Sequence, residues 1–311
     1  MIAILLSTYN GSKYLSKQLD SLLQQTFEEW NLYIRDDCST DDTIEIILHY
    51  CNLDKRIHFI NESSQNLRAP KSFEKLMEFA MDKADYFMFC DQDDYWNNDK
   101  IEITFAEMQK QEKYSNENIL IYGTQLLVDE DLVDLNLPIP KHYRENFGLK
   151  TLLVENPVYG CTMMINKNLL KRSLPFSNHV ENHDYWIAFI ASSLSARVSY
   201  IDKPLMLYRQ HSSNLSGNYK DSHFKQRLKR LIGNKEMISF KKRNLMFSDA
   251  LKQTSNALSS TNRYLIEAFI KKTSKGGISA VLFLISNKIK KQKIIQNIQL
   301  HLLMFKIRLW Y

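Results

Sequence analysis

Two acidic side chains spaced two residues apart follow an apolar run and could bind a divalent cation. Asp91 and Asp93 come directly after the apolar segment 86–90. Carboxylates spaced i,i+2 at a strand end reach the same side, and Mg²⁺ usually takes one or two protein carboxylates besides substrate phosphates. The pattern therefore predicts a metal site, with a solvated acidic turn as the alternative. A calcium loop of the EF-hand type is disfavoured, because Trp96 stands where that loop needs glycine.

Two other polar clusters also follow apolar runs. Asp36 and Asp37 come after a second short run, where they could bind a ligand or supply negative charge to the start of the next helix. The cluster 7–10 follows the run 2–6 and could be an ordinary turn, although Tyr9 offers a flat ring on which a nucleobase could stack.

Two further candidate groups lie later in the chain. Asp184 opens the strongly apolar helix expected over 185–190, where it could act as a general base or only as a charge at the helix N-terminus. His211 follows the apolar run 205–208. It could be a structural hydrogen-bond donor, or together with Arg209 it could contact a metal or a phosphate.

The elements that carry these residues predict an α/β fold. Residues 1–210 alternate short apolar runs with amphipathic stretches, which is the pattern of repeated β-α-β units. Such units form a mostly parallel sheet with helices on both faces, and ligands bind outside the carboxyl ends of its strands. Because the clusters 7–10, 36–37 and 91–94 each follow a strand, we expect them to meet in one crevice.

The composition is that of an ordinary globular protein. The 311 residues are 44% hydrophobic and 24% charged, and 8 Gly and 6 Pro are too few for a loop-built scaffold. The four cysteines form no C-x-x-C pair and the first residues lack signal-peptide features, so we expect a reduced cytoplasmic protein. The longest apolar run, 278–285, is well short of the ~20 residues that a membrane-spanning helix needs.

The net charge of +6 divides unevenly along the chain. Residues 1–220 carry −9, whereas residues 221–311 carry +15, with 19 Lys and Arg against 4 Asp and Glu. Because the pattern also changes to long helical stretches, we expect a boundary near Asn218, with a catalytic domain over 1–218 and a basic helical region over 219–311. Such a basic region is typical of contact with a polyanion, either nucleic acid or an anionic membrane surface.

The end of the basic region favours a membrane surface over nucleic acid. Apolar residues recur there at helical spacing after a group of lysines, which fits binding at the interface of a lipid monolayer. The alternative is a helical cap that packs on the domain or on a second copy of the chain. The apolar stripe comprises Ile294, Ile298, Leu302, Phe305 and Leu309, with Trp310 and Tyr311 following.

Five short motifs occur in order along the chain. They are Ser7-Thr8-Tyr9-Asn10-Gly11, Arg35-Asp36-Asp37-x-Ser39-x-Asp41, Asp91-Gln92-Asp93-Asp94-x-Trp96, His183-Asp184 and Tyr208-Arg209-Gln210-His211-x-x-Asn214. Over about two-thirds of the chain they closely resemble family 2 glycosyltransferases of the GT-A fold, a Rossmann-like nucleotide-binding architecture. The acidic and terminal motifs look like the bacterial subgroup that includes rhamnosyltransferases of cell-wall and capsular polysaccharide assembly.

The resemblance implies roles around a nucleotide sugar. In similar enzymes the aspartate that corresponds to Asp37 accepts a hydrogen bond from the pyrimidine N3. The loop after the first strand, here with Ser7 and Tyr9, lines the site of the base. Asp91 would face the ribose. The nucleotide-sugar-binding set expected from the resemblance is Ser7, Tyr9, Asp37, Lys71, Asp91 and Gln92.

The resemblance also implies a metal and a base. Asp93 would hold Mg²⁺ or Mn²⁺ on the diphosphate, and His211 lies where a third metal or diphosphate contact is expected. Asp184 matches the catalytic base. The family more often shows glutamate where this chain has His183, which leaves His183 without a role.

These expectations combine into an inverting, metal-dependent glycosyl transfer. Asp184 would take the proton from the acceptor hydroxyl as that oxygen attacks the anomeric carbon, without a covalent enzyme intermediate. The subgroup resemblance favours dTDP-L-rhamnose as donor, with a UDP-hexose as the alternative, and a glycan or lipid-linked glycan as acceptor. We therefore expect a cytoplasmic enzyme bound peripherally to the inner face of the cell membrane, with no nucleic acid partner.

Two other classes of protein share part of this pattern. A phosphatase of the haloacid dehalogenase type also places Asp-x-Asp after a buried strand, but its motif continues with Thr or Val where this chain has Tyr95, and the chain has no such motif near its N-terminus. A non-catalytic carbohydrate- or nucleotide-binding module stays open, because acids kept for binding alone would leave the same pattern.

Overall fold

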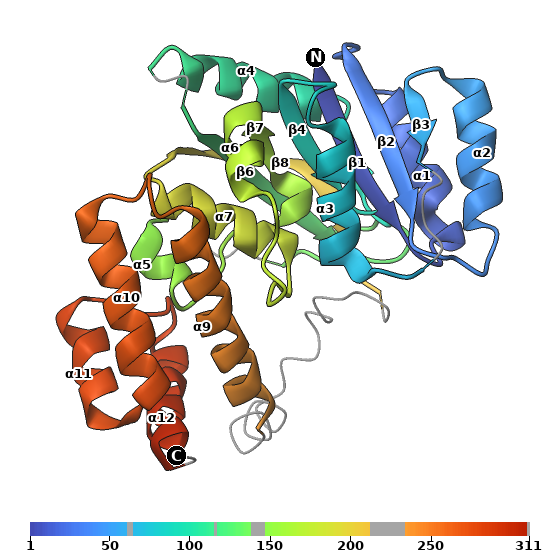
Figure 1. The fold of residues 1–311 in the computed structure, drawn as a ribbon. Coiled ribbons are helices and arrows are strands. Elements are labelled where there is room, and N and C mark those ends of the chain that lie inside the picture. Colours follow the sequence, from blue (N-terminus) through green and yellow to red (C-terminus); the bar gives the residue numbers. More distant parts are fainter. Residues whose placement is uncertain (61–64, 115–116, 138–146, 212–233, 310–311) are drawn as a thin grey trace.

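The computed structural model of the protein describes residues 1–60, 65–114, 117–137, 147–211 and 234–309. The described part is built around an eight-stranded sheet with the order β3-β2-β1-β4-β7-β6-β8-β5 (Figure 1). The strands are β1 (Ile2–Thr8), β2 (Trp30–Asp36), β3 (Ile57–Phe59), β4 (Tyr86–Cys90), β5 (Tyr95–Trp96), β6 (Ile119–Val128), β7 (Met164–Asn166) and β8 (Arg197–Arg209).

The sheet is mixed and mostly parallel, as predicted. Strand β1 pairs in parallel with β2 and β4, β2 with β3, and β6 with β8. Strand β7 runs antiparallel between β4 and β6, and the short β5 is antiparallel to β8. The carboxyl ends of β1, β2 and β4 therefore lie at one edge, where the polar motifs follow them.

Alternation along β1 shows how the sequence builds two cores. Ile2, Ile4 and Leu6 enter a core on one face of the sheet, and Ala3 and Leu5 enter the core on the other face. The first face is covered by α1 (Ser12–Leu23), α2 (Thr43–Leu53) and α4 (Lys100–Glu112), and the second by α3 (Arg68–Ala80), α6 (Lys167–Ser173) and α7 (His183–Ser193). Between β6 and β7 lie the short α5 (Leu149–Leu152) and the 3₁₀ turn η2 (Gly160–Thr162).

The predicted elements around the motifs are present, with different ends in some cases. Strand β4 and the start of α7 lie where they were predicted. Helix α3 begins at Arg68, directly after Leu67. Pro70 is accommodated because it lies in the first turn, where a backbone N–H has no partner within the helix.

The basic C-terminal region is helical, as predicted, and shares the core of the sheet domain. Phe247 of α9 stacks on Phe189 of α7 with 4.1 Å between ring centroids, and Phe269 of α10 lies 6.0 Å from Phe247. The four helices are α9 (Lys235–Gln253), α10 (Ser260–Lys275), α11 (Gly277–Ser286) and α12 (Ile294–Leu309) (Figure 1). The expected boundary at Asn218 lies outside the described residues and stays a prediction, and Asn214, Trp310 and Tyr311 lie outside them too.

The apolar stripe of α12 faces solvent. Ile294 and Leu309 at its two ends are 82% and 86% exposed, and Ile298, Leu302 and Phe305 between them are 51%, 52% and 42% exposed. The core is contacted instead by the opposite side of the helix, through Leu300, Met304 and Ile307. Across the described ranges, no helix combines the length and apolar character needed to cross a membrane.

Candidate active site

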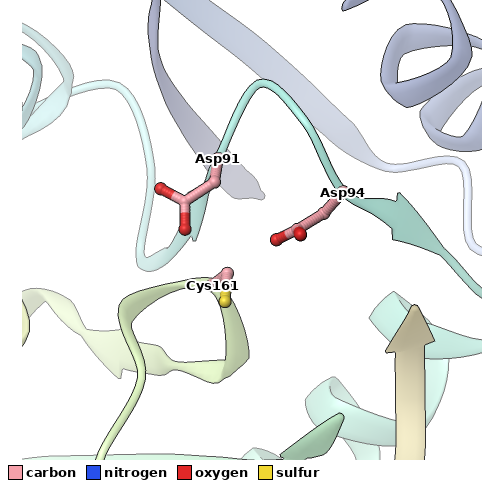
Figure 2. A group of neighbouring side chains, drawn as sticks. All are labelled: Asp91, Asp94 and Cys161. Atoms are coloured by element: carbon pink, nitrogen blue, oxygen red, sulfur yellow. The ribbon is translucent and has the colours of Figure 1, made fainter. Parts of the chain in front are cut away.

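The loop after β4 carries a cluster of acidic groups. One ligand atom each of Asp91, Asp94 and Cys161 lies within 4.8 Å of the other two (Figure 2). Asp94 is fully buried, and its Oδ2 has no hydrogen-bond partner among the described residues. Burial, reinforced by the charges of Asp93 and Asp184, raises the pKa of Asp91 to about 7. The carboxyl groups of this loop are therefore crowded and poorly solvated.

A buried lysine lies close to the acidic cluster. Lys100 is 2% exposed, and its Nζ donates a hydrogen bond to the carbonyl oxygen of Cys161 at 2.8 Å. The same ammonium group lies 4.5 Å from the ring of Trp96. Burial lowers the pKa of Lys100 to about 8, so most of the population is still charged at neutral pH. Sequence reasoning missed this lysine, because no motif distinguishes it from the exposed lysines of other helices.

The two predicted metal ligands, Asp93 and His211, are in direct contact. Nε2 of His211 lies 2.8 Å from Oδ2 of Asp93. The ring of Tyr14 lies 4.9 Å from that of His211 and 4.6 Å from the guanidinium carbon of Arg209. Arg209 donates from Nε to the carbonyl oxygen of Asp93 at 2.8 Å, and from its backbone N–H to Oδ1 of Asp94 at 3.2 Å. Arg209, considered from the sequence as a phosphate contact, thus anchors the acidic loop.

The chemistry of these groups fits a divalent cation. Asp91, Asp93 and Asp94 offer carboxylate oxygens and His211 an imidazole nitrogen, a donor set suited to Mg²⁺ or Mn²⁺. Cys161 is a poor ligand for such a hard cation, and burial raises the pKa of its thiol well above the ordinary value. The unpartnered Oδ2 of Asp94 is the observation that most favours a cation at this loop.

Asp184 lies at the N-terminus of α7, as predicted. Its Oδ2 accepts a hydrogen bond from the backbone N–H of Gly160 at 3.2 Å, and its Oδ1 accepts one from the N–H of Tyr185 at 2.5 Å. Burial raises the pKa of Asp184 to about 6, although the backbone hydrogen bonds oppose the shift. Such a carboxylate is mostly ionised at neutral pH and is basic enough to accept a proton. Its charge also acts on Asp91, so the base lies close to the acidic loop.

His183 packs as a neutral ring beside Asp184. Its ring centroid lies 3.9 Å from that of Phe73 and 5.2 Å from that of Phe89. Its Nε2 is buried and has no hydrogen-bond partner in the described part of the chain. Burial lowers the pKa of His183 to about 3, so the imidazole carries no charge at neutral pH.

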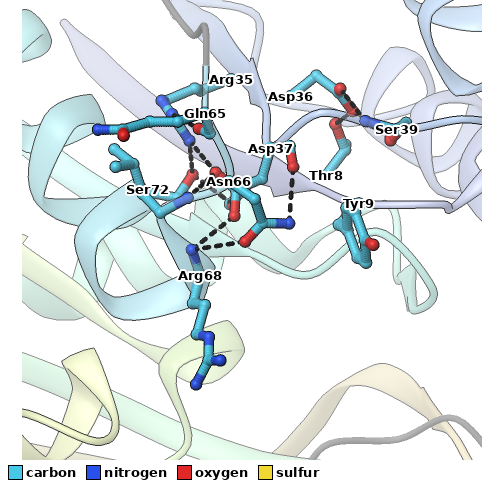
Figure 3. Close-up of polar contacts among 12 residues, drawn as sticks. Thr8, Tyr9, Arg35, Asp36, Asp37, Ser39, Gln65, Asn66, Arg68 and Ser72 are labelled. Carbon is cyan, nitrogen blue, oxygen red and sulfur yellow. Dashed lines mark hydrogen bonds and ion pairs between the residues drawn. The ribbon is translucent and has the colours of Figure 1, made fainter.

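Asp37 organises the loop that leads into α3 (Figure 3). Its Oδ1 accepts hydrogen bonds from the guanidinium of Arg35 at 2.6 Å and from the N–H of Leu67 at 2.8 Å, and its Oδ2 accepts one from the N–H of Arg68 at 2.6 Å. Only 2% of Asp37 is exposed. The predicted contact between Asp37 and a nucleobase therefore requires this loop to open.

Gln92 joins the loop after β4 to the loop after β1. Its Oε1 accepts a hydrogen bond from the N–H of Tyr9 at 2.8 Å, and its Nε2 donates one to the carbonyl oxygen of Tyr9 at 3.0 Å. Gly11 leaves room for this contact, since a Cβ there would lie 2.4 Å from Oε1 of Gln92. The amide of Gln92 thus positions Tyr9, whose side chain is 50% exposed.

Ser7 and Lys71, the remaining predicted nucleotide-sugar ligands, contact α3 and its surroundings. Oγ of Ser7 donates to Oγ of Ser72 at 2.6 Å. Nζ of Lys71 pairs with Glu74 at 2.6 Å and reaches the carbonyl oxygen of Phe176 at 3.4 Å. The structure therefore turns Lys71 toward Glu74 rather than toward Asp37.

The cation paired with Asp37 is Arg35, whose guanidinium lies 2.6 Å from Oδ1. Arg68, which sequence reasoning missed, contacts Asp37 only through its backbone N–H. Its backbone has a positive φ of 64°, and its guanidinium extends away from Asp37 (Figure 3). The side chain of Arg68 is exposed. A positive φ at an arginine has no sequence signal, so this placement could not be predicted.

The sequence profile of Glycosyl transferase family 2 matches residues 3–172, more than half of the chain. These residues include β1, β2, β4 and the acidic loop, whose arrangement is described above. The chain belongs to this family and is a glycosyltransferase.

Two relatives from bacteria illustrate the range of the family. The dTDP-rhamnosyl transferase RfbG of Shigella flexneri is 30% identical over 243 residues, covering 73% of this chain and 78% of its own. The UDP-Glc:alpha-D-GlcNAc-diphosphoundecaprenol beta-1,3-glucosyltransferase WfgD of Escherichia coli is 25% identical over 223 residues, covering 70% of this chain and 80% of its own.

Solved structures agree on the fold. S. aureus TarS 1–349 in complex with UDP-GlcNAc superposes with a TM-score of 0.60 at 19% identity, over 91% of this chain and 79% of TarS 1–349. The mannosyltransferase PcManGT of Pyrobaculum calidifontis, solved with GDP-Man and Mn²⁺, gives a TM-score of 0.53 at 14% identity, over 99% of this chain and 87% of its own. The GT-A fold expected from the motifs is confirmed.

Proposed function

We propose that this glycosyltransferase moves L-rhamnose from dTDP-L-rhamnose to a glycan or lipid-linked glycan in bacterial surface polysaccharide synthesis. The observation that carries the proposal is the meeting of Asp184, a base with a raised pKa, with the acidic loop that holds Asp91 and Asp93. The similarity of the chain to the dTDP-rhamnosyl transferase RfbG supports dTDP-L-rhamnose as the donor. A UDP-hexose is the second candidate, because the name of WfgD gives UDP-Glc as its donor and a diphosphoundecaprenol-linked acceptor.

The transfer inverts the anomeric centre in one displacement. Asp184 accepts the proton of the acceptor hydroxyl while that oxygen attacks the anomeric carbon, and the nucleotide diphosphate departs on the opposite side. The Gly160 and Tyr185 N–H groups keep the carboxylate in place for this step. The chain needs no covalent intermediate, because a single base suffices for a single displacement.

Asp93 and His211, with Asp91 nearby, would hold Mg²⁺ or Mn²⁺ in this mechanism. When bound, the cation supplies charge that offsets the negative charge growing on the leaving diphosphate. The Mn²⁺ present in the PcManGT structure supports a divalent metal in this fold. Arg209 keeps the backbone of Asp93 fixed, so that its carboxylate remains beside His211.

The nucleotide lies over Tyr9 in this proposal, with Asp91 toward the ribose. Tyr9 supplies an exposed ring, and Gln92 holds its backbone. Asp37 meets the pyrimidine when the loop at Arg68 opens, and the guanidinium of Arg68 then lies near the nucleotide. Ser7 walls the base, and Lys71 would have to leave Glu74 to approach it.

Peripheral attachment to the inner face of the cell membrane completes the proposed function. The exposed apolar stripe of α12 and the excess of positive charge over 221–311 support contact with anionic lipid. A lipid-linked acceptor would be reached more readily from such a position. The competing proposal is that the same stripe joins two copies of the chain.

The donor is tested by incubating the purified chain with dTDP-L-rhamnose, UDP-glucose, UDP-galactose and GDP-mannose and measuring released nucleotide diphosphate. Asp184→Asn serves as the matched inactive control. The proposal expects release from dTDP-L-rhamnose alone. Release from a UDP-hexose instead would select the second candidate, and binding without release from any donor would indicate a non-catalytic module.

A further inference from the structure

His183 touches three elements that surround the proposed base. Its ring lies 3.9 Å from Phe73 of α3 and 5.2 Å from Phe89 of β4, measured between centroids. Its Nε2 edge faces Gly160 of η2. The imidazole therefore fills the space between α3, β4 and the turn that precedes β7, immediately before Asp184 in sequence.

Gly160 is in close contact with that imidazole edge. A Cβ at position 160 would lie 2.4 Å from Nε2 and 2.9 Å from Cε1 of His183. Cβ atoms essentially never lie within 3.0 Å of another non-bonded heavy atom, and Gly160 is not among the glycines with positive φ in the described chain. Position 160 is therefore restricted to glycine by the imidazole and not by its backbone conformation.

The same glycine binds the carboxylate of the proposed base. The N–H of Gly160 donates to Oδ2 of Asp184 at 3.2 Å. Any group that sets how closely Gly160 approaches α7 also sets the length and direction of this hydrogen bond. The imidazole of His183 is the group in contact with Gly160 from that side.

We propose that His183 is a positioning residue whose ring holds Gly160 at the distance at which its N–H orients the carboxylate of Asp184. The inference rests on the proposed role of Asp184 as the base. A neutral imidazole suits this place, because a cation beside Asp184 would make the carboxylate less basic. A phenyl ring is longer than an imidazole and would press on Gly160.

A proton-transfer role for His183 itself is disfavoured by the same contacts. Its Nε2 is buried against Gly160, so no acceptor hydroxyl can reach that nitrogen without a rearrangement of η2. Burial also lowers the pKa of His183 to about 3, which makes the imidazole a weak base. His183 acts on the reaction through Gly160.

The test compares Gly160→Ala, His183→Ala and the double variant with the wild-type chain. The added methyl group of Gly160→Ala meets the imidazole in the wild-type background, and displacement of the base by about 1 Å should lower kcat roughly 10- to 100-fold. In the His183→Ala background the same methyl group enters vacated space, so it should lower kcat less than about threefold. Gly148→Ala is the matched control, since a Cβ there has nothing within 4 Å.

Two readouts separate positioning from a merely structural role. Affinity for the nucleotide diphosphate, measured by calorimetry, should stay within about twofold in all variants, because the donor site is not altered. The acid limb of the kcat–pH profile should move to higher pH in His183→Ala and Gly160→Ala, because the ionised Asp184 loses its hydrogen bond from Gly160.

The proposal is overturned if Gly160→Ala lowers kcat by the same factor in both backgrounds. It is equally overturned if His183→Ala reduces only the melting temperature and leaves kcat and the acid limb unchanged, a readout that decides the matter even if Gly160→Ala does not fold. Activity retained in Asp184→Asn has a different meaning. That result would refute Asp184 as the base, and with it the proposed mechanism on which the inference depends.

Discussion

Asp93 and His211, 118 residues apart in the sequence, are joined by a hydrogen bond of 2.8 Å between Oδ2 and Nε2. Asp93 belongs to the loop after β4 and His211 follows β8, so the contact joins the loop after β4 to the end of β8. An imidazole that binds a carboxylate in this way can also turn its nitrogen to a cation placed between them.

His211→Ala should weaken binding of Mn²⁺ together with nucleotide diphosphate by roughly 10- to 100-fold, because it removes one ligand and releases the orientation of Asp93. Asp93→Ala should remove the dependence on metal altogether. Calorimetry with and without EDTA measures both effects. His49→Ala, an exposed histidine on α2, is the control. Equal affinity of the wild-type chain with and without metal would contradict the assignment.

The activity should depend on pH through Asp184. Because burial raises its pKa to about 6, kcat should rise about tenfold per pH unit in acid and level off above about pH 6. The value of kcat rises with pH because only the ionised carboxylate of Asp184 can accept the proton. Asp184→Asn should lower kcat by about 10²–10⁴-fold and remove this limb, with donor affinity nearly unchanged. An acid limb that persists in the Asp184→Asn variant would place the base elsewhere.

The clamp between Gln92 and Tyr9 should control nucleotide affinity. Gln92→Ala removes two hydrogen bonds to the backbone of Tyr9, so affinity should fall roughly 5- to 30-fold, equivalent to about 1–2 kcal/mol. Gly11→Ala should also lower the nucleotide affinity, because it displaces the Gln92 amide. The double variant should lose little more affinity than either single variant. Gln109→Ala on the exposed face of α4 is the control. Fully additive effects would mean that Gln92 contacts the nucleotide directly.

The stripe of α12 should bind anionic membranes. Leu302→Asn with Phe305→Asn should reduce co-sedimentation with anionic liposomes, and added salt should release the wild-type chain, because Lys and Arg near such a surface contribute ~1 kcal/mol each. Leu48→Asn with Leu53→Asn, two exposed leucines of α2, is the matched control. A chain that ignores liposomes and elutes as a dimer, with dimerisation lost in the α12 variant, would identify the stripe as a protein interface.

Much of the fold could be predicted because local hydrophobic patterns in the sequence indicate strands and helices. The run that forms β4 is apolar throughout and ends at Asp91, and the polar start of α7 at Asp184 precedes an apolar helix. Parallel strands then bring these ends together whatever the details of packing. The expected closeness of His211 to the metal on Asp93 came instead from the family motifs.

The individual partners could not be predicted, because they depend on side chains brought together from distant positions. The role of Gln92 toward the nucleotide sugar stays a prediction, but the two hydrogen bonds of its amide to the backbone of Tyr9 had no local signal. Lys71 looked free to approach the nucleotide, yet a helix places Glu74 one turn away from it. The burial of Lys100 among acidic groups follows only from tertiary packing.

The anchor of the acidic loop has a consequence for the order in which the protein is made. Arg209 reaches the carbonyl oxygen of Asp93 across 116 residues of sequence. Strands β1, β2 and β4 and their crossover helices leave the ribosome well before β8, and distant contacts form more slowly than local ones. A growing chain that ends before β8 therefore lacks the contact that fixes the backbone of Asp93, so we expect the acidic loop to reach the arrangement described above only after β8 has been made.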